Sequence, residues 1–186
     1  MDGSPTTAEF SYDVPGATEP GETVWAGAVP GFRRFERTVV VGRGDDCWER
    51  LGAEVLRWGV KRRSGFRVAA LDEAGSVLDD ADLRVTPGAN FRITAGWGPI
   101  TVREPVRVVE VVETAMRVGF SYGTLPGHPV SGEEAFVLHR DGDAVRLTLR
   151  SLTRPAPGGT WRVAFPALLL AQCWYRARYL RVLKED

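Results

Sequence analysis

The sequence predicts an α+β fold in which a curved antiparallel β-sheet wraps around a long C-terminal α-helix. Three features predict it: strand patterns recur through residues 83–151, an amphipathic helix is expected ahead of them at 46–58, and a long helix is expected after them. A bent antiparallel sheet can enclose one amphipathic helix and leave a cavity between them, which is the helix-grip arrangement. The alternative is another α+β domain in which the tyrosine hydroxyls of that helix simply point outward.

The first strand is expected at residues 36–42, which contain a run of β-branched side chains. Asp46 and Glu49 have the spacing of a capping box, so we expect a helix to begin there. The next segment, 58–71, fits either a second short helix or another strand. Its basic run at 61–63 is typical of a solvated surface.

The strands that follow contain two irregularities. Alternation slips at residues 108–109, which predicts a β-bulge or a strand that is buried on both faces. Asp141 and Gly142 separate two alternating segments, 134–140 and 144–151. They predict a hairpin with a type I′ turn, because an Asp-Gly pair accepts the positive φ that this turn requires.

The C-terminal helix is expected to begin at Trp161 or Phe165 and to end near Leu183. Apolar residues recur along it at spacings of three and four, which predicts one buried face. Polar groups on a buried face suit a helix that lines a pocket, so we expect three of them to bind a ligand. These are Gln172, Tyr175 and Tyr179.

The chain is expected to contain two units. Residues 1–35 are rich in Pro, Gly, Thr and Glu and predict an extended, partly mobile N-terminal arm, whereas residues 36–186 predict a single helix-grip domain. The arm contains more aromatic residues than a disordered tail needs, so we expect some of them to dock on the domain. They are Phe10, Tyr12, Trp25 and Phe32.

The charge composition argues against several classes of partner. The chain of 186 residues has 24 basic and 24 acidic side chains, so no overall field attracts nucleic acid or an anionic membrane. The most apolar run is too short to span a bilayer, and the N-terminus lacks the pattern of a secretory leader. We therefore expect a cytoplasmic protein, and the Arg-, Ala- and Gly-rich composition indicates a bacterial source.

Potential metal ligands are few and dispersed. The two cysteines, Cys47 and Cys173, and the two histidines, His128 and His139, lack the spacing of a zinc site. We expect buried, reduced thiols rather than a disulfide. The sequence accordingly predicts no metal site and no cofactor.

The segment 119–134 is the candidate site. It joins two strand patterns through a connection that Pro126 and Pro129 stiffen. A stiff connection of this kind can pre-organise side chains at the rim of a cavity. The candidate side chains are Tyr122, Thr124, His128, Glu133 and Glu134.

These candidates have a chemical and a structural interpretation. An unperturbed His128 would titrate near neutral pH, and Glu133 or Glu134 could orient it or act as a general acid or base. In the structural interpretation, His128 braces the loop and the glutamates pair with arginines. Successive residues of a strand point to opposite faces, so the two glutamates are not expected to form a joint acid–base pair.

The same segment supports a resemblance to a known family. The run Tyr-Gly-Thr-Leu-Pro-Gly-His-Pro at 122–129, followed by Gly-Glu-Glu at 132–134 and by Phe136, resembles the signature of an uncharacterised bacterial and plant family, a domain of unknown function. The likeness covers most of residues 36–183. That family is grouped with the START-like, or SRPBCC, helix-grip superfamily. The resemblance implies the same architecture and, for most superfamily members, binding of hydrophobic or amphipathic small molecules; some members are enzymes.

Three functions are compatible with the sequence. The favoured one is a module that binds a hydrophobic or amphipathic small molecule beneath the C-terminal helix. The second is an enzyme, namely a lyase, isomerase or hydrolase, that uses His128 with Glu133 or Glu134. The third is an interaction module whose aromatic arm binds a partner protein or a second copy of the chain in a homodimer.

Overall fold

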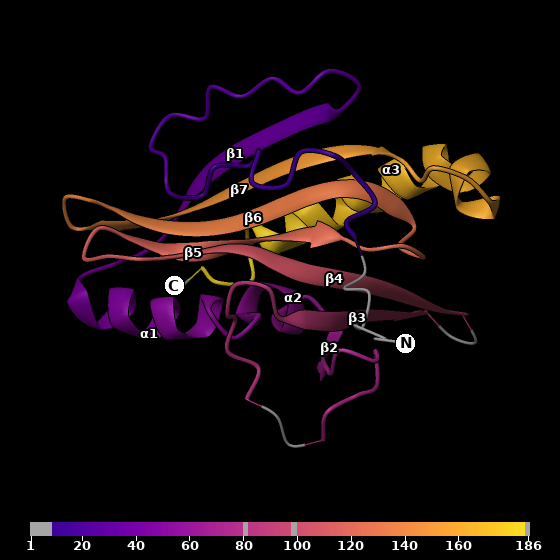
Figure 1. Ribbon diagram of the computed structural model, residues 1–186. Helices are drawn as coiled ribbons and strands as arrows, with labels where there is room; N and C mark the ends of the chain where they lie inside the picture. The colour runs from indigo at the N-terminus through magenta and orange to yellow at the C-terminus, as the bar shows by residue number, and fades with distance from the viewer. Residues whose placement is uncertain (1–8, 80–81, 98–99, 185–186) are drawn as a thin grey trace, which may run out of the picture.

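The structure, a computed structural model, describes residues 9–79, 82–97 and 100–184. This part of the chain forms a seven-stranded antiparallel sheet of order β1-β7-β6-β5-β4-β3-β2 and three helices (Figure 1). Residues 1–8 of the predicted arm and 185–186 of the predicted domain lie outside the described residues. In chain order the elements are β1 (Arg33–Arg43), α1 (Asp45–Val55), α2 (Gly59–Arg63), β2 (Arg67–Leu71), β3 (Asn90–Trp97), β4 (Ile100–Glu113), β5 (Arg117–Thr124), β6 (Val130–Asp141), β7 (Ala144–Pro155) and α3 (Thr160–Tyr179).

The connection between β1 and β2 determines which face of the sheet becomes the interior. These consecutive strands lie at opposite edges of the sheet. Helices α1 and α2 carry the chain from one edge to the other, and α1 packs against β5 and β6 on the way. We call the face that they cover the inner face. α1 closes one end of it, and α3 lies over the other end.

Trp58 anchors the junction between α1 and α2. It is 1% exposed, and its ring centroid lies 4.8 Å from that of Phe120 on β5. The chain bends sharply here, because Trp58 has a left-handed backbone with φ 61°. A Cβ atom at Gly59 would come within 2.7 Å of the Glu54 carbonyl oxygen, so glycine permits the close approach. Segment 58–71 then forms both predicted alternatives in succession, α2 and β2.

The predicted capping box is wrong. Helix α1 begins at Asp45 and its N-cap is Gly44, which provides no side-chain hydrogen bond. The Gly44 N–H instead donates to the Asp143 carbonyl oxygen at 3.0 Å, which ties the helix start to the β6–β7 hairpin. Asp46 and Glu49 therefore lie beyond the cap position.

Both predicted strand irregularities are present, one of them in a different form. The β4–β5 register shifts between Val108 and Glu110, which confirms the bulge. The β6–β7 hairpin is also confirmed, but Asp141 pairs with Ala144, so Gly142 and Asp143 are the central turn residues. Positive φ occurs at Gly142 and not at the residue that follows. This is the pattern of a type II′ turn, and the predicted type I′ turn is wrong.

Helix α3 confirms the predicted long C-terminal helix and completes the helix-grip fold. In Figure 1 it runs behind β6 and β7, and it contacts both strands. Its C-terminal end is firmly packed, because Tyr179 and the following Leu180 are 3% and 5% exposed. Its N-terminal half is not, since Val163 and Leu170 are 84% and 75% exposed. The helix thus closes against the sheet at one end and leaves space beneath the other.

The N-terminal arm, residues 9–32, lies on the outer face of the sheet (Figure 1). Glu133 points from β6 to this face and is 3% exposed. Its carboxylate accepts hydrogen bonds from the Tyr12 hydroxyl at 2.8 Å and the Gly16 N–H at 2.7 Å. The N–H and hydroxyl groups of Thr18 also donate to it. These donors satisfy the hydrogen-bonding needs of a buried carboxylate.

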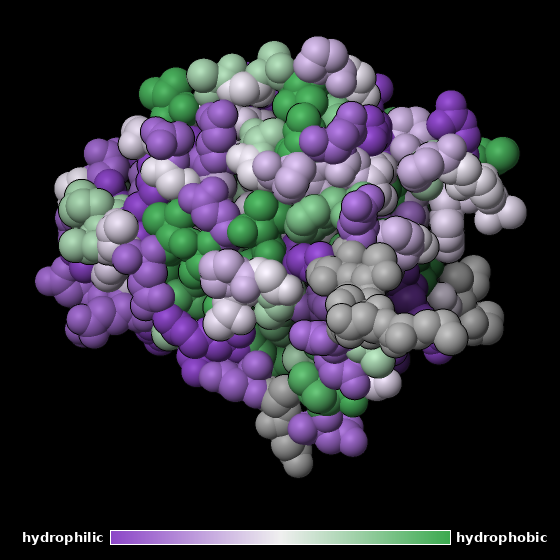
Figure 2. All heavy atoms as spheres, viewed as in Figure 1, coloured by the Kyte–Doolittle hydropathy of each residue, from purple (hydrophilic) through white to green (hydrophobic). Residues whose placement is uncertain are grey.

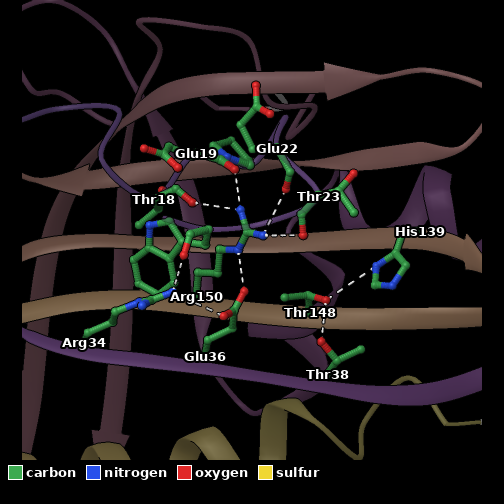
Figure 3. A network of polar contacts seen from close by, with 12 residues as sticks. Thr18, Glu19, Glu22, Thr23, Arg34, Glu36, Thr38, His139, Thr148 and Arg150 are labelled. Atoms are coloured by element: carbon green, nitrogen blue, oxygen red, sulfur yellow. Dashed lines mark hydrogen bonds and ion pairs between the residues drawn. The ribbon is translucent and has the colours of Figure 1, made fainter. Parts of the chain in front are cut away.

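Arg150 of β7 forms the second attachment of the arm (Figure 3). It is 1% exposed, and its Nε donates to Glu36 on β1 at 2.9 Å. The other guanidinium N–H groups donate to backbone carbonyl oxygens of the arm, those of Thr18, Glu19, Glu22 and Thr23. All five donors of a fully buried arginine are therefore used.

The molecular surface has no dominant apolar face on the side shown in Figure 2. Hydrophilic side chains there separate several small hydrophobic patches. Across the whole chain acidic and basic residues are equal in number. Within the described residues no helix is long and apolar enough to cross a membrane.

The first prediction concerns the Arg150 attachment. We expect Arg150→Ala to lower the free energy of unfolding by about 3 kcal/mol or more, because the arm carbonyls would remain buried without donors. Arg146→Ala is the matched control on the same face of β7, where a partly exposed side chain pairs with Asp141. Its cost should stay within about 1 kcal/mol. Urea unfolding of both variants measures the difference, and equal costs would contradict the attachment.

Candidate functional site

A cavity of about 480 Å³ lies between α3 and the inner face of the sheet. Its walls are mainly apolar. One wall consists of small and aliphatic side chains of α3, namely Ala164, Ala167, Leu168 and Ala171, and Val102 of β4 lies among the residues opposite. We call the end of the cavity at the packed C-terminal end of α3 its inner end.

An ion pair occupies the inner end. The Lys61 ammonium of α2 lies 2.9 Å from the Glu134 carboxylate of β6 and donates to the Tyr179 hydroxyl at 2.9 Å. The Tyr122 hydroxyl of β5 also donates to Glu134. All four residues are buried, with less than 10% of each residue's surface exposed. They come from four different elements, so the tertiary fold brings this cluster together.

The cluster holds its charges in place despite its burial. Burial by itself would lower the pKa of Lys61, but the adjacent Glu134 carboxylate raises it above the usual value. The pKa values of Tyr122 and Tyr179 are both raised, mainly by burial and secondly by the negative charge of Glu134. Both hydroxyls therefore remain protonated. Aromatic rings surround the ammonium as well, with the Tyr179 centroid 4.6 Å and the Phe66 centroid 5.0 Å away.

The burial of Lys61 corrects the sequence analysis. The basic run at 61–63 was expected on a solvated surface, and only Arg62 and Arg63 are exposed. Lys61 is 5% exposed because α2 places it over the aromatic inner face, next to Glu134. One feature of the sequence sets Lys61 apart from its basic neighbours. The chain has just two lysines, Lys61 and Lys184, among its 24 basic residues.

Glu104 is the second cavity residue that the sequence analysis missed. It lies on β4 and faces the cavity between Val102 and Val106, where the alternation would place an apolar side chain. Burial raises the pKa of its carboxyl, and the positive charge of Lys61 opposes this. Among the described residues it has no hydrogen-bond or ion-pair partner.

His128 lies near the outer end of the cavity and is held by its own loop. Its Nδ1 lies 2.9 Å from the carbonyl oxygen and 3.1 Å from the amide nitrogen of Val130. Burial, helped by the positive charge of Lys61, lowers the pKa of His128 to about 3. The imidazole is therefore neutral at physiological pH and is a weak base.

The remaining predicted site residues also border the cavity. The Thr124 hydroxyl accepts from the Gly132 N–H at 2.9 Å and shares a hydrogen bond with Ser11 of the arm. Gln172 donates to Thr153 at 3.1 Å, and its buried Oε1 has no partner among the described residues. The Tyr175 ring is tilted against Phe66 and stacked on Tyr179, with centroid distances of 4.6 and 6.1 Å.

The structure separates the two candidate glutamates. Glu134 points into the cavity, whereas the carboxylate of Glu133 lies on the outer face and is bonded to the arm. The predicted opposition of these neighbours is confirmed. The structure therefore does not bring Glu133 and His128 together at one site. His128 and Glu134 do border the same cavity, without a hydrogen bond between them in the described part of the chain.

The described residues contain no group of three or more His, Cys, Asp or Glu that could hold a metal ion. Both cysteines are free, and Cys173 is exposed rather than buried as expected. It occupies the open side of α3, which the helix periodicity alone did not reveal.

The second prediction concerns the buried ion pair. Lys61→Met should lower the free energy of unfolding by about 3–5 kcal/mol, because Glu134 would lose its counter-charge inside the protein. Adding Glu134→Met to this variant should recover part of the loss, since neither charge then remains. Urea unfolding at pH 7 checks both. A double variant that is less stable than Lys61→Met would contradict this account.

The third prediction concerns the protonation of His128. Its ring proton resonances should not shift between pH 8 and pH 5, although the unfolded chain should titrate near 6.5. Because the pKa of His128 is lower in the folded state than in the unfolded state, proton binding favours unfolding. The contribution of neutral His128 to the free energy of unfolding is therefore lost as pH falls below about 6.5. The stability of the wild type relative to His128→Asn should therefore decrease from pH 7 to pH 5. A titration midpoint of His128 between pH 5 and 8 would refute the prediction.

Two solved structures are similar to the chain at 12% sequence identity. The hypothetical protein jhp0584 from Helicobacter pylori has a TM-score of 0.56 and covers 83% of this chain and 89% of its own. Ara h 8.0201 has a TM-score of 0.50 and covers 82% of this chain and 99% of its own. At this identity the likeness shows the fold alone, a helix-grip fold of the Bet v 1 type.

Sequence comparison assigns the family. The profile described as Domain of unknown function (DUF1990) matches residues 12–182, which include much of the arm. A UPF0548 protein from Deinococcus radiodurans is 33% identical over 192 residues, which cover 96% of this chain and 94% of that protein. The chain therefore belongs to the DUF1990 family of domains of unknown function.

Proposed function

We propose that the protein binds a mostly apolar small molecule in the cavity beneath α3. The observation that carries this proposal is the cavity itself, about 480 Å³ in volume and mainly apolar, with a buried ion pair at its inner end. Sites of this size, with apolar walls and a few placed polar groups, are typical of small-molecule binding. Tyr122, Thr124, His128, Gln172, Tyr175 and Tyr179 are the proposed contacts, together with Lys61 and Glu104.

The fold supports the same function. The START-like grouping inferred from the signature at 122–129 agrees with it, because most members of that superfamily bind hydrophobic or amphipathic molecules. The open N-terminal half of α3 offers a route of entry, since Ala164 and Ala167 border the cavity where the helix stands away from the sheet.

Binding has more support than the two alternatives. Catalysis by His128 with a glutamate requires a base of suitable pKa, and the low pKa of His128 and the outward position of Glu133 argue against it. An interaction role for the arm requires free aromatic side chains. Tyr12 and Trp25 are 6% and 3% exposed against their own sheet.

The fourth prediction tests whether the cavity binds ligands. N-phenyl-1-naphthylamine, a neutral apolar probe, should bind saturably and gain fluorescence. Ala171→Trp, which places an indole in the cavity, should weaken this binding about 10-fold or more, equivalent to about 1.4 kcal/mol.

Ala177→Trp is the matched control, because Ala177 lies on the exposed side of the same helix. It should leave the affinity within about twofold of wild type, a change of roughly 0.4 kcal/mol. Unfolding curves establish that both variants are folded. Unchanged binding in Ala171→Trp would place the probe elsewhere and contradict the proposed function.

A further inference from the structure

The inner end of the cavity has unused hydrogen-bond donors. The Lys61 ammonium has three N–H groups; its two close contacts are one oxygen of Glu134 and the hydroxyl of Tyr179, and the Tyr122 hydroxyl is a third hydrogen-bonding neighbour. The Tyr179 hydroxyl accepts from Lys61, and its own hydrogen has no acceptor among the described residues. The Tyr179 hydroxyl can therefore donate to an atom that enters the cavity, with the Lys61 ammonium beside it.

Glu104 adds a third group of this kind. Its carboxyl faces the same cavity and forms no hydrogen bond with the described residues. Its carboxyl lies within electrostatic range of Lys61, Glu134 and Tyr179. Burial raises the pKa of this carboxyl, and a carboxyl in its protonated form donates as well as accepts.

The charges at this end select against an ionic ligand. Lys61 and Glu134 neutralise one another, and Arg176, the other cation near Glu134, donates to Ser151 and is not among the residues that line the cavity. A carboxylate entering the cavity would therefore leave an uncompensated charge away from water. The cost of such a charge is several kcal/mol. A neutral acceptor oxygen meets the free donors without this cost, and the apolar walls fit a hydrocarbon body.

We propose that Lys61, Tyr179 and Glu104 form a recognition site for the carbonyl oxygen of an uncharged, mostly apolar ligand, such as an aryl ketone. This inference rests on the proposed binding function and specifies the chemical class of the ligand. The carbonyl oxygen lies at the inner end and accepts hydrogen bonds from these side chains. The hydrocarbon part lies along α3 toward the open end.

Three ligands with one skeleton test the proposal on the full chain. The first, 2-propionylnaphthalene, carries a ketone. The second, 2-propylnaphthalene, has no polar group, and the third, 3-(2-naphthyl)propanoate, carries a carboxylate. Their ability to displace N-phenyl-1-naphthylamine is measured at pH 7. We expect the ketone to compete about 10-fold better than the hydrocarbon, which is the size of the net contribution that hydrogen bonds to its oxygen can make. The carboxylate should compete less well than the ketone.

Variants then test whether the preference for the ketone arises at the inner end of the cavity. Tyr179→Phe and Glu104→Leu should each reduce the advantage of the ketone to about twofold, because each removes one donor. The affinity of the hydrocarbon in the same variants serves as the internal control and should not fall. Glu104→Gln retains a neutral donor of similar shape, so it should preserve the preference for the ketone.

The outcomes separate this inference from the proposed function. Equal displacement by the ketone and the hydrocarbon would overturn the carbonyl site while apolar binding stands. Strongest displacement by the carboxylate would overturn it in favour of an anion site at Lys61. A ketone preference that survives both Tyr179→Phe and Glu104→Leu would also overturn it. Failure of the fluorescent probe and all three ligands to bind would overturn both proposals.

Discussion

Glu133 and Glu134 are neighbours on β6, and both carboxylates are buried, at 3% and 8% exposure. A strand directs successive side chains to opposite faces, and a buried carboxylate must be hydrogen-bonded or paired. Each face therefore has to supply its own partners. The arm supplies them on the outer face, whereas α2 and β5 supply Lys61 and Tyr122 on the inner face. One constraint thus explains why arm, sheet and α2 are held together at the same place.

The same segments of β5 and β6 therefore contact the arm on one face of the sheet and the cavity on the other. Besides Glu133, Thr124 connects the two, because its hydroxyl bonds both Ser11 of the arm and the N–H of Gly132 in β6. His128 belongs to the same region, and it bonds its own loop rather than a carboxylate. The stiff segment at the centre of the sequence is best explained as a brace that shapes the outer end of the cavity.

At the inner end of the cavity, particular side chains determine which ligand groups can be bound. A helix-grip fold leaves a space between the sheet and the last helix, and apolar walls alone would accept many ligands. Here Lys61 and Glu134 bring opposite charges into that space, and Glu104 lies close to them without a partner of its own among the described residues. Membership of the DUF1990 family brings no activity with it, so this cluster is the most specific guide to function.

Periodicity alone predicted the antiparallel sheet, its bulge, the long final helix and the opposite directions of Glu133 and Glu134, because these features follow from local backbone geometry. It also placed Gln172, Tyr175 and Tyr179 on the helix face that borders the cavity. It missed Lys61, whose basic neighbours indicate a surface, and Glu104, which interrupts an apolar face. The sequence by itself determined which faces are apolar. Only the tertiary structure decided which charges are buried there, because the partners of a buried charge come from strands and helices that are distant in the chain.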